Sequence, residues 1–149
     1  MARIKLAYPK IPGSSKAPLE LCVAFEKYDG TNIHWVWERE LGWYAFGMRR
    51  NRYDLDEFGI AQFHVAHRGY PDAVDIFLRD LARPLAELFT NHPNYVGPEI
   101  TVFTEYFGPQ SFAGLHKDLD TKRLVMFDVS IWTYPGLVGA GLSLNHLLE

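Results

Sequence analysis

The sequence predicts an α+β domain with mainly antiparallel sheets and one or two helices. Segments rich in β-branched and aromatic residues occur early and late in the chain, and such residues favour strands. A segment with one apolar helical face lies between them. The order of strands, helix and strands lacks the steady alternation of a parallel α/β sheet, and 149 residues is the size of one domain.

The first predicted strands flank an Asp-Gly pair. Residues 19–28 and 32–40 read LELCVAFEKY and NIHWVWERE, with Asp29-Gly30 between them. Because Asp-Gly is a strong signal for a tight turn between strands, we expect a hairpin here. A third strand is expected over residues 43–50, WYAFGMRR. The proline-containing residues 1–16 predict an extended lead-in, and residues 17–149 the domain itself.

A helix is predicted over residues 71–89. Its apolar residues recur at spacings of three and four, which places them on one face: Val74, Phe77, Leu78, Leu81, Leu85, Leu88 and Phe89. Asp72 is the expected N-cap. Pro84 should bend or divide the helix, because its ring clashes with the preceding turn. Two later strands are expected over residues 99–108 and 123–132, and a short helix over residues 144–149.

Composition and charge narrow the functional classes. A net charge of −3 argues against coating nucleic acid by bulk electrostatics. The basic run MRRNR at residues 48–52 could bind phosphates locally, but taken alone such a run is most often a solvated surface turn. The single cysteine, Cys22, cannot form an internal disulfide. No apolar run approaches the roughly 18 residues of a membrane span, and the N-terminus lacks a signal-peptide core. We therefore expect a cytoplasmic protein with no membrane partner.

The stretch EKYDGTN, residues 26–32, raises the question of lysine chemistry. An unperturbed lysine has a pKa of about 10.4 and is therefore protonated at neutral pH. A lysine nucleophile needs burial or nearby cations that lower this pKa. A strand end beside a tight turn can hold the amine of Lys27 in place. Lys-x-Asp-Gly also occurs by chance, and on this stretch alone a solvated hairpin explains the pattern equally well.

Later stretches add candidate binding groups. TEYFGPQSFAG places Glu105 at the end of an apolar strand, where a carboxylate can accept ribose hydroxyls or hold a metal. LVMFDV contains Phe127 and Asp128 near a predicted strand end, a ring that can stack on a base and an acid that can orient a neighbour, although core packing is the ordinary role of such a ring. His64 and His67 lack ligand partners at zinc-like spacing and are predicted to be surface or cleft residues.

Taken in order, EKYDGTN, MRRN, VFTEYFGP and VMFDV resemble the adenylyltransferase domain of ATP-dependent RNA ligases, within the covalent nucleotidyltransferase superfamily. The resemblance covers about residues 17–131. Thr31-Asn32 directly after Lys-x-Asp-Gly is more similar to the RNA-ligase branch than to DNA ligases or capping enzymes. Four motifs in the right order are far more specific than any one of them.

The resemblance implies a three-step reaction that uses ATP and Mg²⁺. Lys27 would attack the α-phosphate of ATP, expel pyrophosphate and hold AMP as a phosphoramidate. AMP would then pass to an RNA 5′-phosphate, which an RNA 3′-hydroxyl would attack. Each step is an in-line displacement at phosphorus, so positioning and charge neutralisation dominate.

The resemblance also assigns the remaining site residues by motif. The implied contacts are Glu26 beside the adenine, Asn32 at the nucleotide or an RNA phosphate, Arg50 (or Arg49) at the ribose or phosphate, Glu105 at the ribose hydroxyls and Phe127 stacked on the adenine. Asp29, Gly30 and Asp128 would support these groups. No protein metal ligand is assigned.

The resemblance covers only the earlier motifs of the family. Two family motifs, one with a metal-binding acid and one a Lys-x-Lys pair at the α-phosphate, have no counterpart after Asp128, where no lysine follows. We therefore expect the N-terminal part of such a domain, with impaired activity alone. An exposed sheet edge would favour self-association or a partner chain that completes the domain. The alternatives are a non-catalytic nucleotide- or RNA-binding module and a DNA-ligase-like enzyme.

Overall fold

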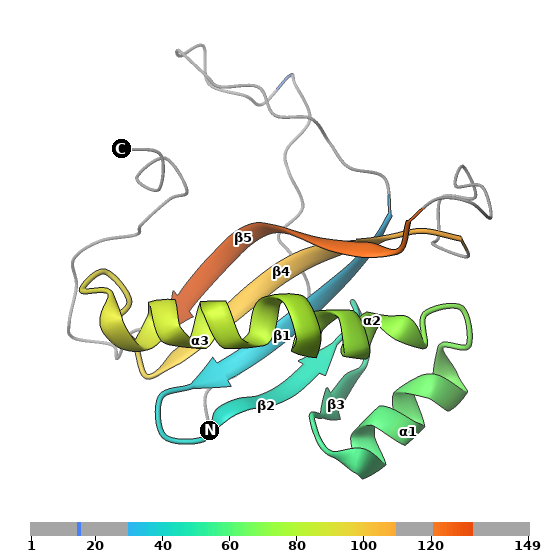
Figure 1. Ribbon diagram of the computed structural model, residues 1–149, viewed down its shortest axis with the longest axis horizontal. Helices are drawn as coiled ribbons and strands as arrows, with labels where there is room; N and C mark the ends of the chain where they lie inside the picture. Colours follow the sequence, from blue (N-terminus) through green and yellow to red (C-terminus); the bar gives the residue numbers. More distant parts are fainter. Residues whose placement is uncertain (1–14, 16–29, 110–120, 133–149) are drawn as a thin grey trace.

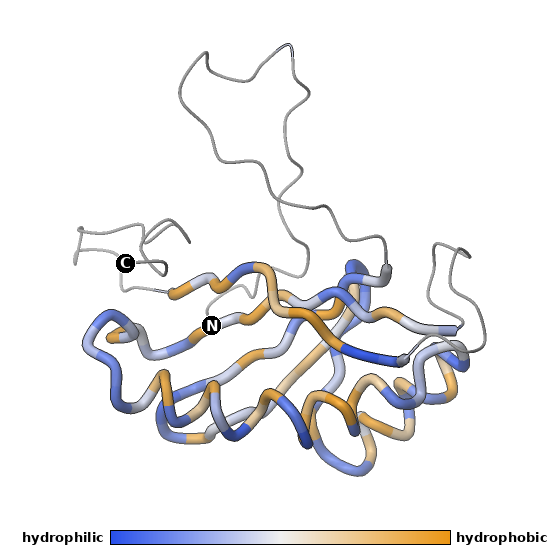
Figure 2. The backbone as a smooth tube through the Cα atoms, turned by 45° about the horizontal axis from the view of Figure 1, so that its top comes forward, coloured by the Kyte–Doolittle hydropathy of each residue, from blue (hydrophilic) through white to orange (hydrophobic). Residues whose placement is uncertain are grey.

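The computed structural model describes residue 15 and residues 30–109 and 121–132. These residues form an α+β fold with one five-stranded antiparallel sheet in the order β3-β2-β1-β4-β5. Figures 1 and 2 show the helices together on one side of this sheet. The α+β class and the antiparallel sheet are therefore confirmed. The predicted strand at 19–28 and the helix at 144–149 lie outside the described residues.

The strands follow the segments rich in β-branched and aromatic residues. They are β1 (Thr31–Glu38), β2 (Gly42–Gly47), β3 (Arg52–Asp54), β4 (Glu99–Phe107) and β5 (Arg123–Trp132). The range of β5 is the predicted one, and β4 ends one residue early. The third strand is shorter than predicted, because residues 48–51 turn the chain into β3, with the Met48 amide donating to the Asn51 carbonyl at 2.9 Å.

The hairpin predicted around Asp29-Gly30 is wrong for residues 34–38, most of its second strand. Residues 34–38 of β1 pair with β2 on one edge and with β4 on the other. Both edges are occupied there, so these residues do not pair with residues 19–28. The hairpin partner of β1 is β2, joined to it through the turn at residues 39–41. Asp29 and the earlier strand lie outside the described residues.

The predicted long helix is present but is divided upstream of its proline. It consists of α2 (Asp72–Ile76), a π-helical turn (Phe77–Leu81) and α3 (Ala82–Asn91). Pro84 has no N–H to donate to the carbonyl four residues earlier, and its ring crowds that carbonyl. The wider π turn accommodates this defect, with the Ala82 amide donating to the Phe77 carbonyl. Leu78, counted on the apolar face, is 45% exposed as a result of the altered helical phase.

The predicted N-cap of this helix is also wrong by one residue. Pro71 occupies the cap position, and no side chain caps the helix. Asp72 is the first helical residue, and its carboxylate pairs with the amine of Lys122, just before β5. This ion pair takes the carboxylate that would otherwise accept a backbone amide.

A second helix, α1 (Glu57–Ala66), was not predicted. Asp56 caps it, since the Asp56 carboxylate accepts the Gly59 amide at 2.7 Å. Its apolar residues do not fall on one face: Phe63 is buried, whereas Phe58 and Val65 are each 72% exposed. The spacing signal that identifies an amphipathic helix is therefore weak in this segment.

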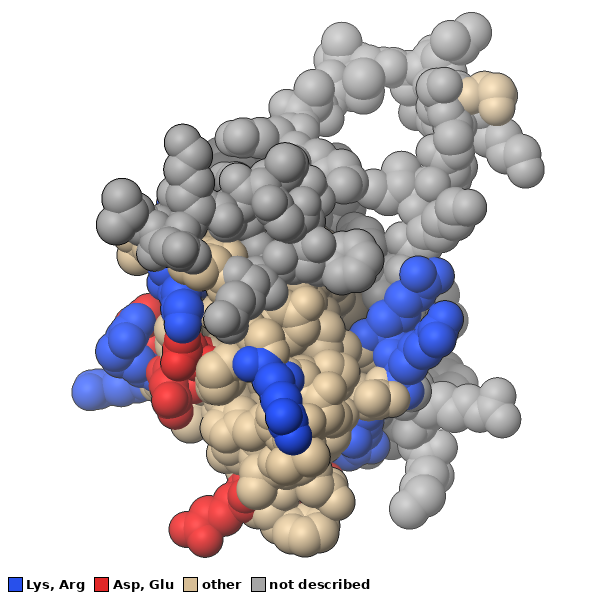
Figure 3. Space-filling view, turned by 90° about the vertical axis from the view of Figure 1, so that its right-hand side faces the viewer, with Lys and Arg blue, Asp and Glu red and all other residues tan. Residues whose placement is uncertain are grey.

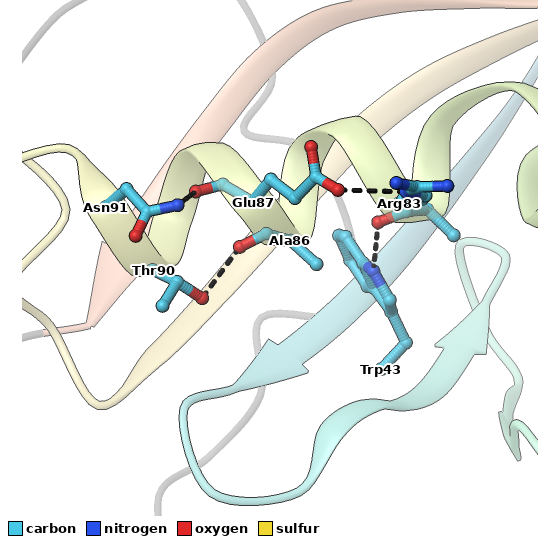
Figure 4. A network of polar contacts seen from close by, with 7 residues as sticks. Trp43, Arg83, Ala86, Glu87, Thr90 and Asn91 are labelled. Carbon is cyan, nitrogen blue, oxygen red and sulfur yellow. Dashed lines mark hydrogen bonds and ion pairs between the residues drawn. The ribbon is translucent and has the colours of Figure 1, made fainter.

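The core lies between the sheet and the helices and is largely aromatic. Trp35 is fully buried and stacks between Phe77 and Phe46, with ring centroids 3.9 and 5.4 Å away. Trp43 lies edge-on to Phe77 and donates its indole N–H to the carbonyl of Ala82 at 2.7 Å. Figure 4 shows this bond joining β2 to the start of α3, beside the exposed polar contacts of α3.

Candidate functional site

Strand alternation divides the residues of β1 and β4 between two faces. On β1, Ile33, Trp35 and Trp37 belong to the core under the helices. Successive side chains point to opposite faces of a strand, so Asn32 and His34 project from the other side. We call this side the open face because it is opposite α1–α3, although its central side chains, such as His34 and Phe103, are buried. On β4, Ile100, Val102 and Tyr106 are in the core, and Phe103 and Glu105 therefore lie on the open face.

The first and third sequence motifs meet on the open face. Asn32 lies directly opposite Glu105 in the antiparallel pairing of β1 and β4, a position in which side chains are in contact distance. The Gly30 amide donates to Oε1 of Glu105 at 3.0 Å. A Cβ on Gly30 would collide with the carbonyl oxygen of Tyr106, so only glycine permits this close approach. The lack of space for a side chain at position 30 thus explains why the motif Lys-x-Asp-Gly has glycine there.

The fourth motif lies on the neighbouring strand. Phe103 pairs with Asp128 and Thr104 with Met126, which leaves Phe127 as the extra residue of a β-bulge. A bulge can redirect a side chain from its regular face. The Phe127 ring lies on the open face beside Phe103, at 6.4 Å between ring centroids. The Asp128 carboxylate accepts the amide of Val129 at 2.8 Å. Phe127 and Asp128 are both partly exposed.

The second motif forms a turn at the same end of the sheet. Arg49 and Arg50 are exposed in the turn between β2 and β3. Gly47, the last residue of β2, lies opposite His34 near the start of β1. The turn is therefore at the end of the sheet that carries Asn32 and Glu105. Figure 3 looks onto this end and shows basic side chains on both flanks and near the centre, with acidic side chains on the left flank and at the lower edge.

Sequence reasoning missed His34 and Tyr44, and it named Arg52 only as the last residue of the basic run MRRNR. Arg52 directly follows the predicted turn motif and lies 5.4 Å from the ring centre of Tyr44. The Tyr44 hydroxyl donates to Glu99 at 2.7 Å, and burial followed by this hydrogen bond raises the pKa of Tyr44. Alternation from Asn32 would have placed His34 on the same face. The position of Arg52 depends on the pairing of β3 with β2, which has no local sequence signal.

His34 is a buried polar group without a partner. Its side chain is fully buried, and neither ring nitrogen has a hydrogen-bond partner among the residues that the structure describes. Burial, and then the positive charge of Arg52, lower the pKa of His34 to about 4. The imidazole is therefore neutral at neutral pH, with one N–H donor and one acceptor.

The remaining predicted residues are placed as follows. Lys27, Glu26 and Asp29 lie outside the described residues. His67 caps the C-terminus of α1 and its ring nitrogen lies 3.0 Å from the hydroxyl of Tyr53. Within residues 30–109 and 121–132, no three His, Cys, Asp or Glu side chains gather closely enough to hold a metal.

Comparisons with known proteins add no relative: no protein-family model matches the chain, and no curated protein shows significant sequence similarity to it. The resemblance to RNA ligases therefore depends on the four motifs themselves. None of the helices in the described part of the chain is both long and apolar enough to span a membrane.

Proposed function

We propose that this chain is an RNA-ligase-like nucleotidyltransferase that uses ATP to form a lysine-AMP intermediate on Lys27 for joining RNA 5′-phosphate and 3′-hydroxyl ends. The observation that carries the proposal is the meeting of separate motifs on one face of the sheet. Gly30 and Glu105, which are 75 residues apart in sequence, are joined by a hydrogen bond, and Phe127 lies on the adjoining strand.

The residues of the open face suit a nucleotide. The carboxylate of Glu105 can accept ribose hydroxyls, and the amide of Asn32 opposite it can donate to a phosphate oxygen. Phe127, set on the bulge and partly exposed, offers an aromatic surface for a base. Glu105, Phe127 and Asn32, on three neighbouring strands, thus offer one partner each for a ribose, a base and a phosphate.

Lys27 is tied to this site by the covalent chain. It precedes Gly30 by three residues, so its Cα lies within about 11 Å of the Gly30 Cα in any conformation. In the proposed reaction the deprotonated Nζ attacks the α-phosphorus. A phosphorus–nitrogen bond forms, the bond to the bridging oxygen breaks, and pyrophosphate leaves. The arginines of the β2–β3 turn supply positive charge that favours the neutral amine. Bound Mg²⁺ would neutralise phosphate charge.

Incubation of the full chain with α-labelled ATP and Mg²⁺ tests the proposal. We expect a covalent labelled adduct that is lost in Lys27→Ala. Lys122→Ala is the matched control, because Lys122 pairs with Asp72 at the start of α2, which packs on the other side of the sheet, and it should retain the adduct. The absence of any adduct in the wild-type chain, or an adduct that survives Lys27→Ala, would contradict the proposal.

The same experiment separates the alternatives. Reversible binding of ATP without an adduct would favour a non-catalytic nucleotide-binding module. If an adduct forms, transfer of the label to a 5′-phosphorylated nicked RNA and not to the matching nicked DNA would favour the RNA-ligase assignment. The opposite preference would favour a DNA-ligase-like enzyme.

A further inference from the structure

The helix α1 carries a second set of apolar residues on the side that faces away from the core. Four residues recur at spacings of three and four and therefore lie on one helical face: Phe58, Ala61, Gln62 and Val65. We call them the outer stripe. Phe58 and Val65 are each 72% exposed, and Ala61 and Gln62 between them are exposed as well. Phe63, on the opposite side of the helix, is fully buried.

The outer stripe has the spacing of a helix–helix contact. One exposed apolar side chain is ordinary on a protein surface. Phe58 and Val65, however, are seven residues apart, which is the repeat at which two helices pack along a shared seam. Ala61 lies between them and is small, so a facing helix can come close to it. Figure 1 shows α1 at the edge of the molecule, where a second helix can approach it.

Charges at the two ends of α1 make the outer stripe complementary to itself. Asp56 and Glu57 stand at the start of the helix, and Arg68 stands just beyond its end. Glu57 and Arg68 are exposed, and neither forms an ion pair within the part of the chain that the structure describes. In an antiparallel pair of α1 helices, opposite charges meet at both ends and the helix dipoles oppose each other. A parallel pair would bring like charges together.

We propose that the outer stripe of α1 is a contact surface for a second copy of this chain, in an antiparallel helix pair with two-fold symmetry. The symmetry axis passes near Ala61 and Gln62, so that Phe58 of each copy packs on Val65 of the other. This contact is made by a helix face and not by the sheet edge that the sequence led us to expect. It would form whether or not Lys27 reacts with ATP.

The size of the contact predicts a weak dimer. The ten residues of α1 span about 15 Å. Two helices of this length bury well below the roughly 1,200 Å² of a stable interface. We therefore expect a dissociation constant of about 10 μM to 1 mM, with rapid exchange between monomer and dimer.

Sedimentation equilibrium of the full chain over a dilution series measures this constant. Val65→Gln should weaken the dimer by about tenfold or more, because it places a polar amide at the centre of the contact. Val96→Gln is the matched control: it makes the same change at a valine that is 77% exposed in the loop between α3 and β4. It should leave the constant unchanged. Both valines are exposed, so both variants should fold.

Charge reversal tests the antiparallel arrangement. Arg68→Glu should weaken the dimer by about threefold to tenfold at low salt, since an acidic group then faces Asp56 and Glu57 of the second copy. An equimolar mixture of Arg68→Glu and Glu57→Arg should associate more tightly than Arg68→Glu alone, because the two altered positions then carry opposite charges.

Three results would overturn the inference. The first is a wild-type chain that stays monomeric at about 1 mM. The second is a dimer of undiminished affinity in Val65→Gln, which would place self-association on another surface. The third is a mixture of the two charge variants that associates no better than Arg68→Glu alone, which would exclude the antiparallel pair.

Discussion

Each face of the sheet has one buried polar side chain without a hydrogen-bond partner in the described part of the chain, Tyr106 under the helices and His34 on the open face, but the two faces differ in their other side chains. Under the helices, Trp35 donates to the hydroxyl of Thr104, which in turn donates to the carbonyl of Ile33, both at 2.9 Å. On the open face, the fully buried His34 has no hydrogen-bond partner for either ring nitrogen among the described residues. The open face also carries the charged side chain of Arg52, which contacts Tyr44.

Under the proposed function, ligand chemistry belongs to the open face, and the aromatic core under the helices supplies stability. A strand places alternate residues on opposite sides, so a single strand such as β1 can contribute Trp35 to the core and Asn32 to a site. Substitutions on the two faces should therefore have separable effects.

Substitution of the central core tryptophan should have the largest effect on stability. Trp35→Ala removes a fully buried ring stacked against Phe77 and leaves a cavity. We expect the free energy of unfolding to fall by about 3–5 kcal/mol, measured by urea denaturation.

Phe127→Ala is the matched substitution on the open face. Phe127 is partly exposed, so its loss should destabilise the fold far less, by about 1 kcal/mol, while ATP binding weakens. Equal destabilisation by the two variants would remove the distinction between the faces.

Acidification should destabilise the protein through His34. Its pKa of about 4 is lower than the ordinary 6.5, so the unfolded chain binds more protons than the folded chain between these values. The contribution is fully present above pH 6.5 and is lost as the pH falls toward 4. The loss approaches about 3 kcal/mol. Unfolding of wild type and His34→Gln, measured across this range, should show a smaller pH dependence in the variant. Parallel curves would contradict the assignment.

Loss of Arg39 should have a moderate effect confined to stability. Its guanidinium donates to the carbonyls of Phe89 and Tyr95 at 3.1 and 2.6 Å and lies over the ring of Trp37. Arg39→Ala should lower the free energy of unfolding by about 1–2 kcal/mol, because the carbonyls at the end of α3 lose a charged donor. Thermal unfolding measures this change. ATP affinity should stay at the wild-type value, and a parallel loss of affinity would argue against separable faces.

The smallest stability effect is expected for Glu105→Gln. The amide oxygen of glutamine can still accept the Gly30 N–H, so the free energy of unfolding should change by less than about 1 kcal/mol. ATP binding should nevertheless weaken, because the negative charge that accepts ribose hydroxyls is lost. Glu87→Gln on the exposed side of α3 serves as the control. Wild-type ATP affinity in Glu105→Gln would remove Glu105 from the site.

The sequence predicts those parts of the fold that have a local signal. β5 matches its predicted range because β-branched and aromatic residues recur at every second position from Val125 to Ile131. The position of the π turn was not predictable from helical spacing, because the response to Pro84 depends on packing of residues such as Phe77. The partners of β1 could not be read either, since strand pairing joins residues far apart in the chain.

The candidate site shows the same limit. Ordered motifs identified Asn32, Glu105 and Phe127, but nothing in the sequence showed that Asn32 lies opposite Glu105. The proximity of His34 to Arg52, which the sequence names only within the run MRRNR, was missed because the two residues are related through Gly47 on a third strand. The sequence thus predicted individual candidate residues. That these residues share one face of the sheet became known only from the pairing of the strands.

Nuclear magnetic resonance mapping of ATP and Mg²⁺ binding tests the division of the two faces most directly. We expect the largest shifts in side-chain signals of the open face, at Asn32, His34, Phe103 and Phe127. The indole signals of Trp35 and Trp43, on the helix-covered side, should change little. Shifts concentrated at the tryptophans and α1–α3, or no shifts at saturating nucleotide, would contradict the account.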